Sequence, residues 1–383
     1  MASNTLTGLI PTILEALDIV SRERVGFIPA VTRNTMADRA AVGQTVSWPV
    51  TPAMTPQDIT PAATGPNPSG VTIAPASISL TKQKSIPFPW NGEDTKGALN
   101  AGFYHQTLMD QFTQAFRALG NLIEVDLGLL AYSASRAFGT AGTTPFGTAS
   151  DLSDLANMLK ILKDNGAPEN DLHLVINTAA GLNLRGKQSL LFKVNESGTS
   201  DLLREGILGR LEGFQVGESA GVATHAPGTG SAYVIDGTGN IAVGSTLLKA
   251  KTGSGTIVAG DVLAIQSDTN RYVVGAGLAA PGTFTIGAPG LLVASVDGKT
   301  ITPAASYSAN LAFGRNALAL ATRTPAMPEG GDAAVDARIF TDPASGLAFD
   351  VRMYRQYHQV SFEVGIVWGT AVGKTEHMAL LLG

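Results

Sequence analysis

The sequence predicts an α+β protein built on one long helix and several long strands, with extended segments that have no core of their own. Apolar residues recur at helical spacing from about Leu99 to Ala137, which predicts an unusually long helix. Two stretches of alternating polar and apolar residues flank a proline- and glycine-rich centre within residues 43–92, which predicts a long hairpin. Two further alternating segments near the C-terminus predict a long antiparallel pair.

The composition narrows the class of protein. The 383 residues include 26 Lys and Arg and 31 Asp and Glu, a formal net charge of −5. Charged residues make up 15% of the chain, against about 25% in an average soluble protein, so much of the surface is neutral and suits contact with other subunits. The sequence has no cysteine, which excludes disulfides and cysteine-based metal sites or nucleophiles. A net acidic chain without a basic run is a poor candidate for sequence-specific binding of nucleic acid.

No segment predicts secretion or a membrane span. The N-terminus lacks the basic start and long apolar core of a secretory signal. Residues 272–296 carry no charge, but five glycines and two prolines interrupt them, which favours short strands and turns. We therefore expect a soluble protein that is made in the cytoplasm and has no membrane partner.

The first 92 residues predict two arms. Residues 1–35 contain a short amphipathic helix with Pro11 at its first position, ended by Ile28-Pro29, and its apolar face must dock on another part of the protein. The hairpin over 43–92 contains nine prolines. A hairpin of that length has little core of its own, so we favour an arm that lies on a neighbouring subunit over a mobile surface loop.

The helix that follows would approach about 55 Å and serve as a structural spine. Residues 150–224 then predict a mixed α/β region. It comprises a helix capped by Ser150-Asp151, a buried strand over 172–176, a short helix over 179–187 and a strand over 213–219.

Residues 225–310 contain fourteen glycines and no net charge, which predicts a small β-barrel or sandwich inserted in the chain. Its expected strands are Tyr233–Ile235, Ile241–Val243, Thr256–Val258, Val262–Ile265, Tyr272–Val274, Phe284–Ile286 and Leu291–Val296. The apolar run Asn310–Ala321 predicts a central strand. The alternating segments Leu347–Met353 and Val360–Trp368 predict the closing antiparallel pair.

One motif suggests catalysis. Gly217-Glu-Ser-Ala-Gly221 matches the G-x-S-x-G pattern that exposes a nucleophilic serine, here Ser219, between a strand and a helix. Pro227 and Gly228 break any helix that could follow, and no oxyanion segment precedes the motif. Asp350 or Asp336 and His358 or His377 could complete a triad, as such a pair could in any long chain. We therefore favour a strand end with a glycine turn over a hydrolase.

Other motifs fail on spacing. Gly369–Thr375 is one residue short of a phosphate-binding loop, and Gly298-Lys-Thr300 has valine at 293, where its first glycine should be. The five histidines show no metal-ligand spacing, and His173, in a predicted buried strand, is most simply a core residue. We expect no catalytic, cofactor-binding, metal-binding or nucleic-acid-binding residues, and no cofactor.

The order of these parts resembles the major capsid (coat) proteins of tailed bacteriophages, whose fold herpesvirus capsid proteins share. Four stretches look like sequences of the short-tailed phage coat proteins that carry an inserted β domain. They are Met1–Thr7 with Leu9-Ile-Pro-Thr12, Leu203-Arg-Glu-Gly-Ile-Leu-Gly-Arg-Leu-Glu-Gly-Phe214, Asn310–Ala321 and Trp368-Gly-Thr-Ala371. The resemblance spans nearly the whole chain and rests on the order of the parts.

The resemblance implies a role for each segment. Residues 1–35 would be the N-terminal arm, 36–92 the extended loop, and 93–139 the spine helix of the peripheral domain. Residues 140–224 and 310–334 would form the axial domain, 225–309 the inserted β-barrel, and 335–383 the long strands of the peripheral domain. On this reading Ser219 ends an axial-domain strand just before the insertion.

The implied function is structural and not enzymatic. Copies of the chain would assemble as hexamers and pentamers into the icosahedral shell of the virion, in the host cytoplasm. The partners would be further copies, a scaffolding protein, a portal protein and, in some members, a decoration protein. DNA would be enclosed without sequence-specific binding. The alternatives are an encapsulin-type compartment, a serine hydrolase using Ser219, and a monomeric β-rich binding module.

Overall fold

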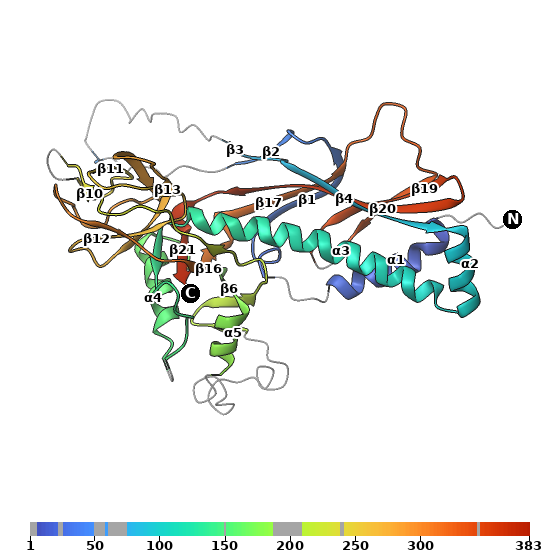
Figure 1. The fold of residues 1–383 in the computed structure, drawn as a ribbon, viewed down its shortest axis with the longest axis horizontal. Helices are drawn as coiled ribbons and strands as arrows, with labels where there is room; N and C mark the ends of the chain where they lie inside the picture. The colour runs from blue at the N-terminus through green and yellow to red at the C-terminus, as the bar shows by residue number, and fades with distance from the viewer. Residues whose placement is uncertain are drawn as a thin grey trace.

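The computed structural model describes residues 6–21, 26–49, 58–59, 75–148, 151–186, 209–237, 241–342 and 345–383. The molecule is elongated, and helix α3 runs along one face of a long β-sheet toward a second sheet (Figure 1). The helices and 3₁₀ turns are α1 (Leu6–Ser21), α2 (Gly92–Ala101), α3 (Tyr104–Leu129), η1 (Leu130–Ser133), α4 (Ser153–Asp164), α5 (Thr178–Arg185), η2 (Arg315–Ala317) and η3 (Thr375–His377).

A six-stranded sheet assembles segments from both ends of the chain. Its strands are β1 (Thr32–Ala40), β4 (Lys82–Asn91), β17 (Leu318–Pro325), β18 (Asp336–Thr341), β19 (Ala348–Gln356) and β20 (Gln359–Val372). The predicted closing pair is confirmed, because β19 and β20 are antiparallel from Asp350↔Gly365 to Gln356↔Gln359. β4 pairs with β20 over ten residues, and β1 runs parallel to β17.

The core of this region lies between the sheet and α3. Phe112 and Phe116 of α3 contact sheet residues, with ring centroids 5.0 Å from Phe88 and 4.9 Å from Phe349, respectively. α1 docks on α3 through buried residues that include Ile13 and Leu17, as its amphipathic pattern predicts.

The single helix expected from Leu99 to Ala137 is wrong in extent. Gly102 adopts a left-handed conformation (φ 78°), and its N–H bonds to the carbonyls of Ala98 and Leu99, which ends α2. The chain then restarts as α3, ends at Leu129 and passes through η1 into a short strand. The apolar periodicity continued across these breaks because both helices and the strand contribute to one core.

The prediction for Pro11 is also wrong, since α1 begins five residues earlier, at Leu6. The N–H of Leu6 donates to Asp336 Oδ2 at 3.1 Å, so a residue distant in sequence caps the helix.

A thirteen-stranded sheet forms the other end of the molecule. Its strands are β5 (Arg136–Phe138), β6 (Leu172–Ile176), β7 (Arg210–Leu211), β8 (Phe214–Glu218), β9 (Thr224–His225), β10 (Val234–Ile235), β11 (Leu247–Lys251), β12 (Val262–Ile265), β13 (Arg271–Ala276), β14 (Gly282–Ile286), β15 (Ile301–Pro303), β16 (Tyr307–Gly314) and β21 (Met378–Leu382). The predicted strands over 172–176 and 213–219 are confirmed as β6 and β8.

Helix α4 covers this sheet through Leu155, Met158 and Leu162. Its N-cap is Leu152, without a side-chain cap, so the predicted cap at Ser150-Asp151 is wrong in part. Asp151 Oδ1 does accept the N–H of Ser153 at 2.7 Å, and Ser150 lies outside the described residues. The predicted helix over 179–187 corresponds to α5, which Asn177 caps.

The apolar run Asn310–Ala321 is buried but does not form one strand. The turn η2 separates β16, which pairs with β21 in the thirteen-stranded sheet, from β17, which pairs with β20 in the six-stranded sheet. The predicted division, with residues 310–334 in the axial domain and 335–383 in the peripheral domain, therefore does not match the two sheets. β17 belongs with the long strands, and β21 belongs beside β16. An apolar sequence predicts that a segment is buried, but it does not predict which sheet the segment joins.

The segment between β9 and β16 has an apolar core of its own, which includes Tyr233, Leu263, Val274, Phe284 and Ile301. We call it the β-rich segment. Four of the expected runs contain strands, namely β10, β12, β13 and β14. The runs 241–243, 256–258 and 291–296 form only isolated bridges, because tight turns interrupt them. The segment joins the rest of the molecule where β13 pairs with β5.

Candidate assembly surfaces and the Ser219 motif

The predicted hairpin has a fixed base. β2 (Thr45–Pro49) and β3 (Pro75–Ser79) are antiparallel, in register from Thr45↔Ser79 to Pro49↔Pro75. Leu80 closes the base through backbone hydrogen bonds with Gly43 (2.8 Å) and Gln44 (2.9 Å). A Cβ on Gly369 of β20 would lie 2.1 Å from the Ser79 carbonyl oxygen, so the hairpin base rests directly on the sheet.

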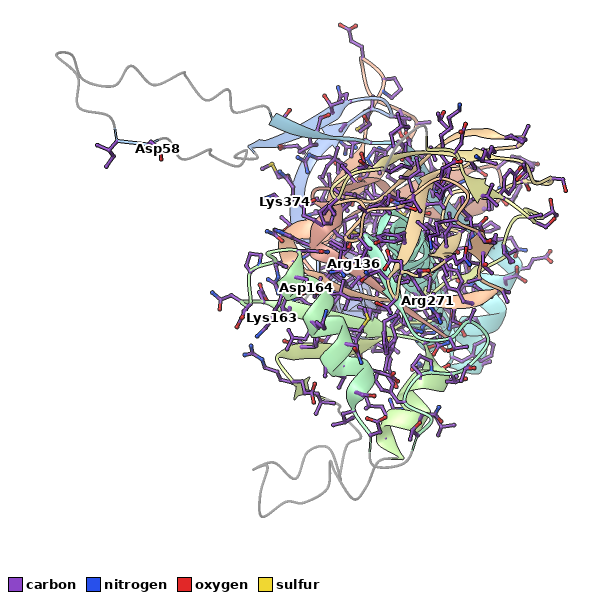
Figure 2. The ribbon with its side chains drawn as sticks, turned by 90° about the vertical axis from the view of Figure 1, so that its left-hand side faces the viewer. Asp58, Arg136, Lys163, Asp164, Arg271 and Lys374 are labelled. Carbon is purple, nitrogen blue, oxygen red and sulfur yellow. The ribbon has the colours of Figure 1, made fainter. Side chains whose placement is uncertain are left out.

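Between β2 and β3 the structure describes two residues, Asp58 and Ile59. Asp58 lies well away from the rest of the chain (Figure 2). Ile59 beside it is 98% exposed. The remainder of the predicted tip, residues 50–57 and 60–74, lies outside the described residues.

Helix α3 also presents apolar residues to solvent. Ala118, Leu122, Val125 and Leu129 are exposed and follow one another at spacings of four, three and four, so they share one face, the α3 seam. Two charged residues of this half of the helix point elsewhere: Glu124 is buried, and Asp126 bonds to Lys82 and Trp368. Such spacing is typical of helices that pack against another element.

Ser219 is not placed as a nucleophile. It is 5% exposed, and its Oγ donates to Glu124 Oε2 at 2.6 Å and accepts the N–H of Gly221 at 3.0 Å. The Glu124 carboxylate also accepts the N–H groups of Phe27 (3.0 Å) and Ile28 (2.8 Å). We call this arrangement the Glu124 knot. It ties the segment after α1 and the end of β8 to the C-terminal half of α3.

The glycines of the motif let three backbones approach one another. A Cβ on Gly221 would lie 2.7 Å from the carbonyl carbon of Glu124, and one on Gly128 would lie 2.1 Å from the Gly221 carbonyl oxygen. A Cβ on Gly26 would lie 2.8 Å from Ser219 Cβ. Gly221 of the G-x-S-x-G pattern therefore reflects close packing, since any larger residue there would push the segments apart.

The proposed triad partners are engaged elsewhere. Asp350 bonds to Arg39 and Arg352, and Asp336 caps α1. His358 lies in the β19–β20 turn with φ 57°. His377 faces Asn316 Oδ1 at 3.2 Å, and burial lowers its pKa. No contact between Ser219 and a histidine occurs among the described residues.

Replacing Ser219 with alanine is expected to lower the free energy of unfolding by about 1 to 3 kcal/mol, because one buried acceptor loses its donor. Assembly is expected to persist. Denaturant unfolding and sedimentation measure the two effects. A generic ester assay on wild type and variant provides the control, and hydrolysis that the substitution abolishes would contradict the structural role.

The remaining motifs have ordinary places. His173 is buried in β6 beside Asp171 at 3.1 Å, as a core residue would be, and burial lowers its pKa although Asp171 opposes the shift. Residues 369–372 belong to β20 and not to a loop before a helix. Within the described ranges, no cluster of potential ligands could hold a metal ion, and no helix is long and apolar enough to cross a membrane.

Several solved structures have a fold similar to that of this chain. The capsid of cyanophage P-SCSP1u is 12% identical and covers 94% of this chain and 88% of its own, with a TM-score of 0.50. A chain of Mycobacterium phage Che8 (14% identical; 96% and 87% covered) has a TM-score of 0.44, and a virus-like particle from Pyrococcus furiosus (10%; 97% and 98%) has one of 0.45. No protein-family model and no curated protein matches the chain.

The likeness to the cyanophage capsid extends over nearly the whole chain. The protein therefore has the fold of the major capsid proteins of tailed phages, as the sequence predicts, while the inserted β-barrel expected over residues 225–309 stays a prediction.

Proposed function

We propose that this chain is a major capsid protein whose copies assemble, as hexamers and pentamers, into the icosahedral shell around a phage genome. The capsid fold over nearly the entire chain carries the proposal. The role is structural and non-catalytic, and the working location is the virion, after assembly in the host cytoplasm. The partners are further copies, a scaffolding protein, a portal protein and, where one is present, a decoration protein, with DNA enclosed without sequence-specific contact.

Two surfaces support self-assembly. The β2–β3 hairpin is anchored at its base and carries the exposed Ile59 away from the body, which suits a contact on a neighbouring copy. The α3 seam offers a second apolar surface on the longest helix. In a closed shell every such contact is repeated in each copy, so individually weak contacts sum to a stable particle.

The experiment is sedimentation velocity on the chain expressed alone and with a scaffolding protein, followed by negative-stain imaging of the fast fraction. We expect megadalton particles from wild type. Val125→Lys places a charge on the α3 seam and should reduce the fast fraction at least tenfold, with unfolding unchanged because the side chain is already exposed. His105→Lys, exposed on the first turn of the same helix, is the matched control.

The outcomes separate the alternatives. Scaffolding and portal proteins that copurify support the phage capsid, whereas an enclosed enzyme cargo supports an encapsulin-type compartment. A 39.5 kDa monomer under every condition would contradict self-assembly.

A further inference from the structure

The β-rich segment contacts the rest of the molecule where β13 pairs with β5, where Val262 and Val273 pack in the main apolar core, and at two polar joints. The chain enters it through β9 and leaves it through β16, and these strands pair with each other at Thr224↔Ser308 and His225↔Tyr307. A unit attached only through such a two-stranded stalk could bend and rotate about it. Whether it does depends on what fixes the stalk and on whether a second attachment exists.

The first joint fixes the stalk, and we call it the stalk joint. His225 Nε2 lies 2.8 Å from Asp261 Oδ1, and both side chains are buried. The His225 ring lies between Tyr132 and Tyr307, with ring centroids at 4.9 and 5.1 Å. Asp261 also accepts the N–H groups of Gly228 (3.1 Å) and Val258 (2.8 Å), so one carboxylate ties the stalk to two turns of the β-rich segment.

Two further contacts close this joint. The Tyr307 hydroxyl donates to the Gly260 carbonyl, and burial raises the pKa of Tyr307, so the hydroxyl keeps its proton. A Cβ on Gly260 would lie 2.9 Å from the Tyr132 ring and 3.1 Å from the His225 ring. Tyr132 belongs to η1, at the end of the spine helix, so the stalk is packed directly against the body.

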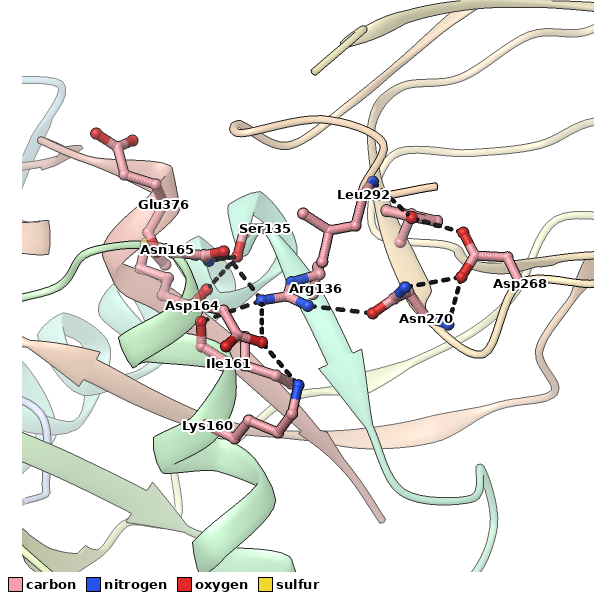
Figure 3. Close-up of polar contacts among 12 residues, drawn as sticks. Ser135, Arg136, Lys160, Ile161, Asp164, Asn165, Asp268, Asn270, Leu292 and Glu376 are labelled. Carbon is pink, nitrogen blue, oxygen red and sulfur yellow. Dashed lines mark hydrogen bonds and ion pairs between the residues drawn. The ribbon is translucent and has the colours of Figure 1, made fainter. Parts of the chain in front are cut away.

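The second joint centres on Arg136 of β5, and we call it the Arg136 joint (Figure 3). This arginine is only 2% exposed. On the body side it donates to the Ile161 carbonyl (3.2 Å) and to Asn165 Oδ1 (3.0 Å), and on the other side to Asn270 Oδ1 (3.1 Å) of the β-rich segment. Asn270 is itself held by Asp268, whose second oxygen accepts the Tyr272 hydroxyl at 2.7 Å.

We propose that these two joints lock the β-rich segment to the body in one orientation within the single subunit. Each joint contains a buried charged group, Asp261 in one and Arg136 in the other, whose hydrogen bond across the joint would be left unmade if the segment turned away. Unmade buried hydrogen bonds are costly. Together with the β13–β5 pairing, the two joints remove the rotation that the stalk alone would allow. The segment is a rigid extension of each copy, and its angle is set before any contact with a neighbour. This inference does not rest on the proposed function.

The test measures one distance within the full-length chain. Because the sequence contains no cysteine, Gln114→Cys on α3 and Thr283→Cys on β14, both exposed, give two unique sites for spin labels. Pulsed electron paramagnetic resonance then gives the distribution of distances between them. We expect a single narrow peak in the otherwise wild-type chain.

Two substitutions open the joints from the side of the β-rich segment. His225→Phe keeps a ring between the tyrosines but loses the bond to Asp261, and Asn270→Ala leaves Arg136 its partners on α4. Each alone should keep the single peak, and the two together should at least double its width. Lys249→Ala, which breaks a surface ion pair with Asp236 inside the segment, is the matched control and should change nothing.

Hydrogen exchange at Val274 and Ile286, whose N–H groups bond within the segment, checks that its core stays folded in the double variant. A wild-type distribution as broad as that of the folded double variant would overturn the lock, and so would a double variant as narrow as wild type. If the double variant unfolds, the wild-type width decides: a single narrow peak supports the lock, and a broad or multiple one overturns it.

Discussion

Replacing Glu124 with alanine is expected to lower the free energy of unfolding by about 3 to 5 kcal/mol, because three buried donors lose their acceptor and each such loss costs about 1 to 3 kcal/mol. The change leaves the N–H groups of Phe27 and Ile28 and the hydroxyl of Ser219 without their acceptor, in a site where Glu124 itself is only 3% exposed. It also leaves a cavity between the helix and two close-packed segments. Denaturant unfolding measures the loss, and hydrogen exchange at Phe27 and Ile28 locates it.

The matched control is Asp110→Ala, an exposed carboxylate on the same helix that bonds to the equally exposed Gln106. We expect a change there of less than about 0.5 kcal/mol. Glu124→Gln, which keeps the shape and one acceptor oxygen, should fall between the two. Equal losses for Glu124→Ala and Asp110→Ala would contradict the role of the Glu124 knot.

Removing the hairpin is expected to abolish assembly while leaving a folded subunit. Leu80 and Gln44 already share a backbone hydrogen bond of 2.9 Å, so an Asn-Gly turn can replace residues 45–79 without moving the flanking strands. Among the described residues of this stretch, the deletion removes one buried large side chain, Ile78, so we expect the free energy of unfolding to fall by about 1.5 to 3 kcal/mol. Sedimentation velocity should show loss of the megadalton fraction.

A full-length chain with Ile59→Asn serves as the comparison, because it keeps the hairpin backbone and changes one exposed apolar contact. Its assembly should be weakened but not lost. Particles of normal size from the deletion variant would show that the hairpin is dispensable for closure. An unfolded deletion variant, seen by circular dichroism, would instead place the hairpin within the core.

The spacing of apolar residues was sufficient to predict most elements. A helix or strand that buries one face needs apolar residues at regular intervals, and these intervals are visible in the sequence. β6, β8, β12 and the β19–β20 pair lie where alternation or an apolar run placed them. The predictions failed where a break depends on one residue's backbone or on a distant partner. Gly102 splits the expected spine helix by turning left-handed, and Asp336 lets α1 start before Pro11.

The candidate site was harder to predict. The sequence indicated that the Ser219 motif was more typical of a strand end, but it gave no role for Glu124. The only available signal was an acidic residue beside Ile123 and Leu127 on the apolar face of a predicted helix. The donors that satisfy it come from residues 27, 28 and 219, and no local pattern links positions so far apart.

The sequence by itself determined the kinds of element, their order, the neutral surface and the arms without a core, because these depend on composition and on local repeats. The tertiary structure alone decided which sheet each buried strand joins, which carboxylate is buried, and how the β-rich segment is attached. In each case the sequence contains several apolar or polar residues that could form the contact equally well. Geometry separates them, through close backbone approach at Gly128 and Gly221 and through the hydrogen bonds that buried groups such as Arg136 and Asp261 must find.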